Sequence, residues 1–384
     1  MKYVAYPLTQ PGRCRRSTSS ACRIRCFSAP IHPSVSSSVE TLNQHACTGC
    51  KLRDSSHVRP EVDLTDDEDM EHAPERIVAI DWSGRVDDAG QRRHIVAGVW
   101  TAANVARGSA GAGARRRGDP AVVRLESGRT RDEVANWLID LASQTPRMVV
   151  GFDFCFGFPE WFARGEHGCE TGPDFWQAVA REHGERWLTR GHHDRRFWGK
   201  PWKRPAEFSG KEIHRMLRAT DIDCKLIAHI PEEERAARVR GITPKSVFQI
   251  GGSGSVGTAS LRGMPMLLKL RSAGFRVWPF DIPQLNATPP RPLVVEMYSR
   301  LNTGPVHKSN PAARRAYLDR KRAEDGHYAA LSRAVLSKAL AGEDAFDALV
   351  STMVMADRRA DFPNLPTPRD PKHRVEGWTW APSV

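Results

Sequence analysis

Acidic residues end or interrupt short apolar runs at three places in the sequence. Asp81 follows the run IVAI, Asp153 follows MVVGF, and Glu296 lies inside LVVEM. A carboxylate among apolar residues loses hydration, which costs free energy unless an opposite charge compensates it. In an α/β sheet the carboxyl ends of the strands are also where ligands bind. Each acid alone could simply end its strand and cap a loop, but the three together favour a divalent metal site.

A second group of acids lies near the C-terminus, where Asp344 and Asp347 are three residues apart. On a helix this spacing puts both carboxylates on one face. Together with Asp81, Asp153 and Glu296 they could hold two metal ions about 3.5–4 Å apart, the arrangement that serves in-line phosphoryl chemistry. Oxygen ligands favour Mg²⁺ or Mn²⁺ over zinc. The sequence therefore predicts a site for two Mg²⁺ or Mn²⁺ ions.

Two basic segments could contact nucleic acid. In the first, aromatic residues are interleaved with cations, so that bases could stack while the phosphates are neutralised. The second is a basic helix expected over 312–323. The aromatic residues could equally form the core of a small subdomain, and the basic helix could simply be exposed. The candidate nucleic-acid contacts are Arg195, Arg196, Trp198, Lys200, Trp202, Lys203, Arg204, Arg314 and Arg315.

A Gly/Ser loop over 251–257 contains the candidate phosphate-binding residues Gly252, Ser253, Gly254 and Ser255. Successive backbone N–H groups in such a loop can form a concave anion site. The loop is not a Walker A motif, because no Gly-Lys-Ser/Thr closes it, and a flexible turn before a helix is the alternative. His307 and Lys308, which follow the strand of Glu296, are a further and weaker candidate for a phosphate contact.

Strands and helices must bring these acids together, and the sequence predicts where those elements and the larger segments of the chain lie. Residues 1–73 are rich in Ser, Pro and Arg with little apolar periodicity, which predicts a disordered tail. An α/β domain is expected over 74–360, with a Trp- and Arg-rich insertion of short helices at about 157–260 and a C-terminal extension over 361–384. Hydrophobic patterns and a helix cap at Thr130 predict the individual elements. The strands are expected at 77–80, 94–101, 121–125, 148–152, 275–278 and 293–297, and the main helices after Thr130 and at 261–273, 312–323 and 343–356.

Composition narrows the class of protein. The chain has 384 residues, of which 40% are hydrophobic and 27% charged, which excludes a wholly disordered or coiled-coil protein. Lys and Arg exceed Asp and Glu by 12, so an anionic partner is expected, with nucleic acid ahead of a membrane. No apolar run approaches the roughly 18 residues of a membrane span. Only three cysteines follow the first fifty residues, which favours a reduced, cytoplasmic protein.

The predicted order of elements resembles the ribonuclease H-like fold, in which acids lie on the first strand, the fourth strand and the last helix. Six segments, in order, are similar to the family called domain of unknown function 429, described as predicted nucleases of this fold. They are IVAIDWSG, VVGFDFCFGFP, SVGTASLRGMPML, VWPFD, VVEMYS and DAFDALV. The first and last also resemble motifs of RuvC-type Holliday-junction resolvases. The resemblance covers about residues 76–357.

The resemblance implies a mixed α/β sheet flanked by helices, with Asp81, Asp153 and Asp347 as catalytic metal ligands and Asp344 assisting. It leaves Glu296 open, because the fifth strand of such folds need not supply a ligand. The insertion after Asp153 has no counterpart in small ribonucleases H and could either carry specificity or cover the site.

We therefore expect a nuclease that cleaves phosphodiester bonds by a two-metal carboxylate mechanism. Two alternatives stay open. The first is a small-molecule phosphotransferase of the actin-like or sugar-kinase type, against which the chain lacks a clear duplicated half. The second is a non-catalytic nucleic-acid-binding protein. The sequence specifies neither DNA nor RNA, and it gives no oligomeric state.

Overall fold

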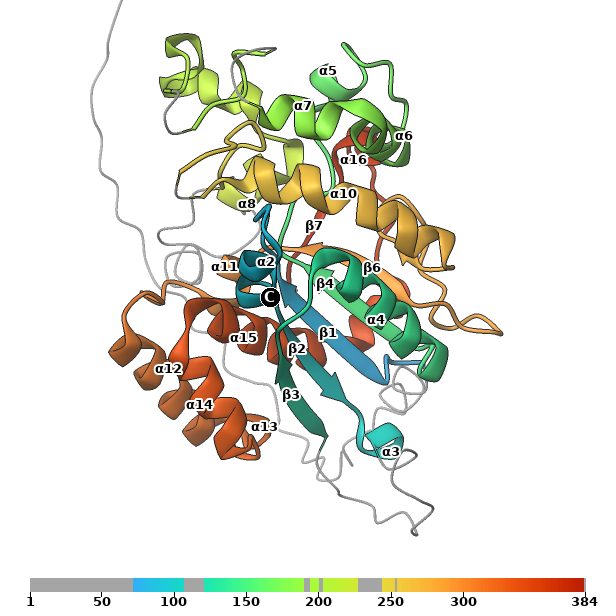
Figure 1. Ribbon diagram of the computed structural model, residues 1–384. Helices are drawn as coiled ribbons and strands as arrows, with labels where there is room; N and C mark the ends of the chain where they lie inside the picture. The colour runs from blue at the N-terminus through green and yellow to red at the C-terminus, as the bar shows by residue number, and fades with distance from the viewer. Residues whose placement is uncertain are drawn as a thin grey trace, which may run out of the picture. The chain divides into compact units, whose positions relative to one another are not determined.

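The computed structural model describes residues 72–106, 121–189, 194–199, 203–226, 244–252 and 254–382. These residues belong to one of the two units into which the chain divides, Val62–Val384. The expected tail over 1–73 lies outside the described residues except for its last two positions. Figure 1 labels the helices and strands of this second unit.

A mixed sheet forms the centre of this unit, which confirms the expected α/β class (Figure 1). Strand β2 is antiparallel to both of its neighbours, β1 and β3, whereas β1, β4, β6, β5 and β7 pair in parallel. The order across the sheet is β3-β2-β1-β4-β6-β5, with β7 also paired to β6. The strands are β1 (Arg76–Asp81), β2 (Val96–Thr101), β3 (Val122–Glu126), β4 (Met148–Phe152), β5 (Arg276–Val277), β6 (Leu293–Met297) and β7 (Thr379–Trp380).

Helices cover both faces of the sheet. On one face, the alternate residues Val78 and Ile80 of β1 pack with α4 (Arg131–Gln144) and α10 (Val256–Ser272). On the other face, Ile77 and Ala79 pack with α15 (Glu343–Asp357). A helical layer behind α15 consists of α11 (Ser299–Thr303), α12 (Pro311–Glu324), α13 (Gly326–Ala329) and α14 (Arg333–Ala341). The alternation along β1 therefore decides which side chains meet α15.

Two glycines let α15 lie unusually close to the sheet. A Cβ added at Gly98 of β2 would lie 2.1 Å from Thr352 Oγ1 and 2.7 Å from the Ala348 carbonyl oxygen. One added at Gly151 of β4 would lie 2.7 Å from Met355 Sδ. Real side chains do not approach so closely, so a larger residue at either position would push α15 away. These two glycines thus determine how closely α15, which carries Asp347, approaches the sheet.

Short helices between β4 and α10 add an aromatic region to the hydrophobic core on the α4 and α10 face of the sheet. Phe162 and Phe248 contact edge to face at 5.1 Å, and Trp187 stacks on Phe197 at 5.3 Å. The insertion expected at about 157–260 therefore holds its aromatic residues inward. Its elements are α5 (Glu160–Ala163), α6 (Gly172–Ala178), a π-helix (Val179–His183), α7 (Gly184–Leu188), two 3₁₀ helices (Ala206–Phe208 and Gly210–Met216) and α8 (Ala219–Leu226).

Most expected elements are confirmed, and two regions differ in detail from the expectation. A strand was expected to begin at residue 94, but α2 (Asp88–His94) occupies the preceding turns, because the Asp87 side chain accepts from Gly90 N–H and caps it. The segment 361–384 was expected to be an extension. Its described part instead completes the fold, because β7 pairs with β6 and Phe362 and Trp380 are buried in the core. The remaining short elements are α3 (Ala103–Ala106), a 3₁₀ helix (Arg359–Asn364) and α16 (His373–Glu376).

Candidate functional site

Asp81 and Asp153 lie side by side at the carboxyl ends of β1 and β4. The last register pair of these parallel strands is Ile80 with Phe152, so the next position on each is an aspartate. The Asp153 N–H donates to the Ile80 carbonyl oxygen at 3.1 Å, which continues the ladder by one step. Because side chains alternate along a strand, both aspartates share the face of Ile77 and Ala79, which α15 covers.

Asp347 reaches the same place from α15. Its side chain is only 2% exposed, and Oδ2 accepts a hydrogen bond from the Ser299 hydroxyl at 3.3 Å. Ser299, the residue that begins α11, also hydrogen-bonds Asp153 through both its hydroxyl and its backbone N–H. The other oxygen of Asp347, Oδ1, is buried and has no hydrogen-bond partner. Such an atom is costly to bury, unless a ligand completes its coordination.

The three carboxylates raise one another's affinity for protons. Burial raises the pKa of Asp81 well above its usual value, and the charges of Asp347 and Asp153 raise it further. Burial also raises the pKa of Asp153, although the hydrogen bonds from Ser299 oppose this. Burial raises the pKa of Asp347 to about 6 against the influence of Lys308. These shifts are those of like charges crowded in a poorly hydrated site, which a cation would relieve.

One cation is already present in this cluster. The ammonium of Lys308 forms a salt bridge with Asp347 Oδ2. Burial disfavours the charge on Lys308, but Asp347, Asp81 and Asp153 together hold its pKa above the usual value. The loop that carries Lys308 is fixed from both sides. Arg300 donates to the Val306 carbonyl oxygen, and Arg314 donates to those of Lys308 and Leu340.

Asp344 lies beside the cluster with a partner of its own. It raises the pKa of Asp81, so it lies within electrostatic reach of that residue. Its Oδ2 contacts His94 Nδ1 at 2.9 Å, and the side chain is 38% exposed. The assisting role that the resemblance implies for Asp344 stays a prediction, but its position is peripheral to that of Asp347.

Glu296 has a different environment from the three aspartates. In the register it pairs with Phe152, on the face that α10 covers, whereas Asp153 lies one position further and on the other face. Arg218 donates to both of its oxygens at 2.7 and 2.8 Å. The Thr379 hydroxyl and the Phe156 N–H donate to them as well. Because both of its oxygens already accept hydrogen bonds, we exclude Glu296 from the candidate metal ligands and assign it to a buried ion pair.

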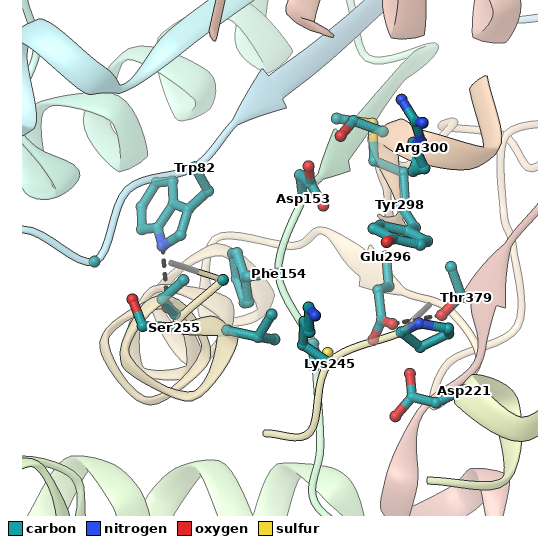
Figure 2. Close-up of a pocket in the computed structure, with 18 of the residues that line it drawn as sticks. Trp82, Asp153, Phe154, Asp221, Lys245, Ser255, Glu296, Tyr298, Arg300 and Thr379 are labelled. Atoms are coloured by element: carbon teal, nitrogen blue, oxygen red, sulfur yellow. Dashed lines mark hydrogen bonds between the residues drawn. The ribbon is translucent and has the colours of Figure 1, made fainter. Parts of the chain in front are cut away.

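A cavity of about 690 Å³ lies between the carboxyl edge of the sheet and the insertion. Asp153, Ser299 and Lys308 line it, so the acidic cluster is accessible from this cavity. Figure 2 shows Trp82 and Ser255 on one side of the cavity, Glu296 and Thr379 on the other, and Asp153 between them. The volume is in the range of ordinary small-molecule sites.

The candidate nucleic-acid contacts separate into buried and exposed residues. Trp198 is only 6% exposed and belongs to the core, so it cannot stack on a base. Arg196 pairs with Asp194 and Glu166, and Arg314 is 4% exposed. These three expectations are therefore wrong, because local partners already engage the side chains. Arg195, Lys203, Arg204 and Arg315 are exposed, whereas Lys200 and Trp202 lie outside the described residues.

The candidate phosphate loop lies at the edge of the cavity. Gly254 and Ser255 line it, and Gly252 and Gly254 have φ of 81° and 73°, the conformation that glycine adopts without strain. Ser255 precedes α10, and its side chain makes no capping hydrogen bond. Ser253 lies outside the described residues. The role of the loop in phosphate binding stays a prediction.

The residues at the cluster fit a divalent cation in their chemistry. Carboxylate oxygens are the ligands that Mg²⁺ and Mn²⁺ prefer, and the partnerless Asp347 Oδ1 offers one of them. Within the described part of the chain, no three His, Cys, Asp or Glu side chains are already arranged to hold one ion together. Small side-chain movements around Ser299 and Lys308 would therefore accompany binding.

Comparison of the chain with protein-family models, with curated proteins and with solved structures finds no significant match. In the described residues, no helix is long and apolar enough to span a membrane.

Three residues of the site carry little or no signal in the sequence alone. Lys308 is only a weak candidate there, Ser299 is one polar residue after the segment VVEMY, and Arg218 is one cation in a basic run. A signal does exist for Ser299, because it lies two residues after the end of β6 at the carboxyl edge of the sheet. Arg218 has one local partner, Asp221, but its other partners, Glu296 and Glu376, lie 78 and 158 positions away.

Proposed function

We propose that this protein is a metal-dependent nuclease that hydrolyses phosphodiester bonds. The observation that carries the proposal is the meeting of Asp81, Asp153 and Asp347, from two strand ends and one helix, in a cluster beside a cavity, with Asp347 buried and the other two half-buried. Three clustered acids of raised pKa are costly unless they have a ligand, and functional sites are where such costs are found.

We also propose that the sheet is of the ribonuclease H-like type and that the chain belongs to the family it resembles in sequence. The strand order, with β2 antiparallel to its neighbours, supports this. So does the placement of acids at the ends of β1 and β4 and on α15. The free thiols of Cys155 and Cys169 are compatible with the proposed cytoplasmic location.

Asp81, Asp153 and Asp347 would hold the cation, and Ser299 would fix the orientation of the last two. A divalent ion bound there would polarise a phosphoryl oxygen and lower the pKa of a bound water. In the reaction, a bond forms between the water oxygen and phosphorus while the phosphorus–oxygen bond of the ester breaks. The proton that water loses passes to solvent, and the leaving oxygen takes one up. Water and a diester thus give a monoester and an alcohol.

The test is cleavage of end-labelled single-stranded and duplex DNA and RNA oligonucleotides, with Mg²⁺ or Mn²⁺ and with a chelator. We expect cleavage of at least one substrate only with metal. Asp81→Asn should lower the rate by about 100-fold or more, because one charge that stabilises the site is lost. Asp140→Asn, a change at an exposed acid on α4, is the matched control and should cleave like the wild type. Metal-independent cleavage, or full activity of Asp81→Asn, would contradict the proposal.

One observation favours a second function. The cavity of about 690 Å³ would suit a small phosphorylated molecule, and the start of α10 with Gly254 and Ser255 lies at its edge. The alternative is therefore a small-molecule phosphotransferase. Consumption of ATP in the presence of sugars or nucleosides, without oligonucleotide cleavage, would support it over the nuclease.

A further inference from the structure

The Lys308 ammonium lies among the three carboxylates of the proposed metal site. It pairs with Asp347, and it is close enough to Asp81 and Asp153 for both to stabilise its charge. Its side chain is 31% exposed and lines the cavity beside Asp153 and Ser299. A substrate phosphate that entered the cavity and met these aspartates would therefore meet Lys308 as well.

The backbone around Lys308 is held by buried or half-buried arginines. Arg314, which is 4% exposed, donates to the Lys308 carbonyl oxygen at 2.5 Å and to that of Leu340 at 2.7 Å. Arg300 donates to the Val306 carbonyl oxygen at 2.5 Å. These hydrogen bonds to the carbonyl oxygens of Lys308 and Val306 therefore fix the backbone of residues 306–308. The support around Lys308 is of the kind that positions a functional side chain.

The charges of the cluster admit one divalent ion more readily than two. Three ionised carboxylates and one ammonium leave two net negative charges, which a single divalent cation neutralises. A second divalent ion would leave the half-buried site with two net positive charges, beside an ammonium that it would repel. Burial of uncompensated charge of this size is strongly unfavourable.

We propose that Lys308 takes the place of the second metal ion, so that the site binds one divalent cation and the ammonium contacts the substrate phosphate directly. This inference rests on the proposed hydrolytic function and replaces the expected pair of ions. In the same reaction, Lys308 would donate a hydrogen bond to an oxygen of the phosphoryl group and stabilise the negative charge that develops there. The ammonium keeps its proton, so the balance of the hydrolysis is unchanged.

The test is Mn²⁺ binding to the full chain, measured by calorimetry and by electron paramagnetic resonance. The wild type should bind one Mn²⁺ at a site that Asp81→Asn abolishes. Lys308→Met keeps the length of the side chain and removes its charge. Because the ammonium no longer competes for the carboxylates, the Kd for Mn²⁺ should fall by about tenfold, a change of about 1.4 kcal/mol. Turnover at saturating Mn²⁺ should fall in the same variant.

Lys269→Met, at an exposed lysine on α10, is the matched control and should bind Mn²⁺ like the wild type. Two bound Mn²⁺ ions in the wild type would overturn the inference and leave the nuclease proposal intact. An unchanged Kd in Lys308→Met would also overturn it. If Lys308→Met did not fold, the number of Mn²⁺ ions bound by the wild type would still decide between one ion and two. Absence of any Mn²⁺ bound at Asp81 would contradict the proposed function itself.

Discussion

At the scale of single residues, the molecule contains two clusters of acidic side chains whose negative charge is compensated to different extents. Glu296 and Asp221 have their charge met by Arg218, which is itself 1% exposed and donates to both. Among the described residues, Lys308 is the cation that pairs with the cluster of Asp81, Asp153 and Asp347, and one oxygen of Asp347 has no partner. Removing one partner of the first cluster would be strongly destabilising, because it would leave an uncompensated buried charge. The second leaves negative charge unmet, as a metal site does before its ion binds.

The first prediction concerns Asp81→Asn without metal. A carboxylate whose pKa is raised by folding contributes stability below its unfolded value, here 3.8, and loses that contribution as the pH rises through the folded value. The wild type should therefore lose stability relative to Asp81→Asn as the pH rises from about 4 to 7. In chelator at pH 7, the variant should have the higher Tm, by about 1–2 °C for each kcal/mol of relieved repulsion in a unit of this size.

Thermal melts over this pH range, with Asp140→Asn as the control, check the prediction. Addition of Mn²⁺ should raise the Tm of the wild type but not that of Asp81→Asn. A variant that is less stable than the wild type at pH 7 would show that Asp81 is a structural residue.

At the scale of elements, the site depends on how closely α15 approaches the sheet. The helix carries Asp347, and the strands that it crosses carry Gly98 and Gly151 at the points of contact. The α15 residues that meet these glycines are Ala348, Thr352 and Met355, and Asp347 directly precedes Ala348 on the helix. The lack of a side chain on the strands therefore lets α15 bring Asp347 near Asp81 and Asp153. A glycine on β2 in this way helps to position a proposed metal ligand without touching it.

The second prediction compares two glycine substitutions. In Gly98→Ala the new methyl group would overlap Thr352 Oγ1, so α15 must shift. We expect a loss of about 1–3 kcal/mol in the free energy of unfolding. Affinity for Mn²⁺ should also fall, because Asp347 moves with the helix. Gly326→Ala is the control, since nothing lies within 4 Å of a Cβ there. Urea denaturation and Mn²⁺ titration measure both effects, and equal behaviour of the two variants would contradict the proposed role of Gly98.

Much of the element pattern could be predicted from the sequence, whereas the pairing of charges could not. The strands β4 and β6 have the predicted bounds, because each is a short and largely apolar run. The face on which Glu296 lies follows from its register with Phe152, which no local pattern encodes. Trp198 and Arg196 have the composition of a nucleic-acid surface, but their contacts within the insertion bury or engage them.

At the scale of the whole molecule, the insertion and the sheet together enclose the candidate site. The helices α5 to α8 lie near α10 and α16 in Figure 1, and the cavity has walls from both the insertion and the sheet. Arg218 binds Glu296 of β6 and the Glu376 carbonyl oxygen near α16, which ties α8 to the sheet. A substrate must therefore reach Asp153 through a space that the insertion limits. The exposed cations Arg195, Lys203, Arg204 and Arg315 are available for longer-range attraction.

The third prediction concerns these four exposed cations. If they bind a nucleic-acid backbone, changing all four to Gln should weaken binding and reduce the slope of log K against log salt by roughly 0.7–0.9 for each phosphate that is no longer neutralised. Mn²⁺ binding should stay unchanged, because none of the four belongs to the acidic cluster. Filter binding or fluorescence anisotropy over a salt series measures the slope. The control changes Lys269 and Lys372, two other exposed cations, to Gln. An equal change in slope for each charge removed would indicate attraction by net charge alone.

The pairing of β7 with β6 has a consequence for the order in which the fold is completed during synthesis. Asp81 and Asp153 are made early, but Asp347 is made much later, and Thr379 later still completes the bonds to Glu296. Domains form from the N-terminus onward as the ribosome proceeds. The chain made up to α14 therefore carries two of the three proposed ligands, and before β7 is made the carboxyl half of β6 lacks its partner strand on that side. The three aspartates can meet only after α15 has been made, so the proposed site is completed late in synthesis although two of its residues are made early.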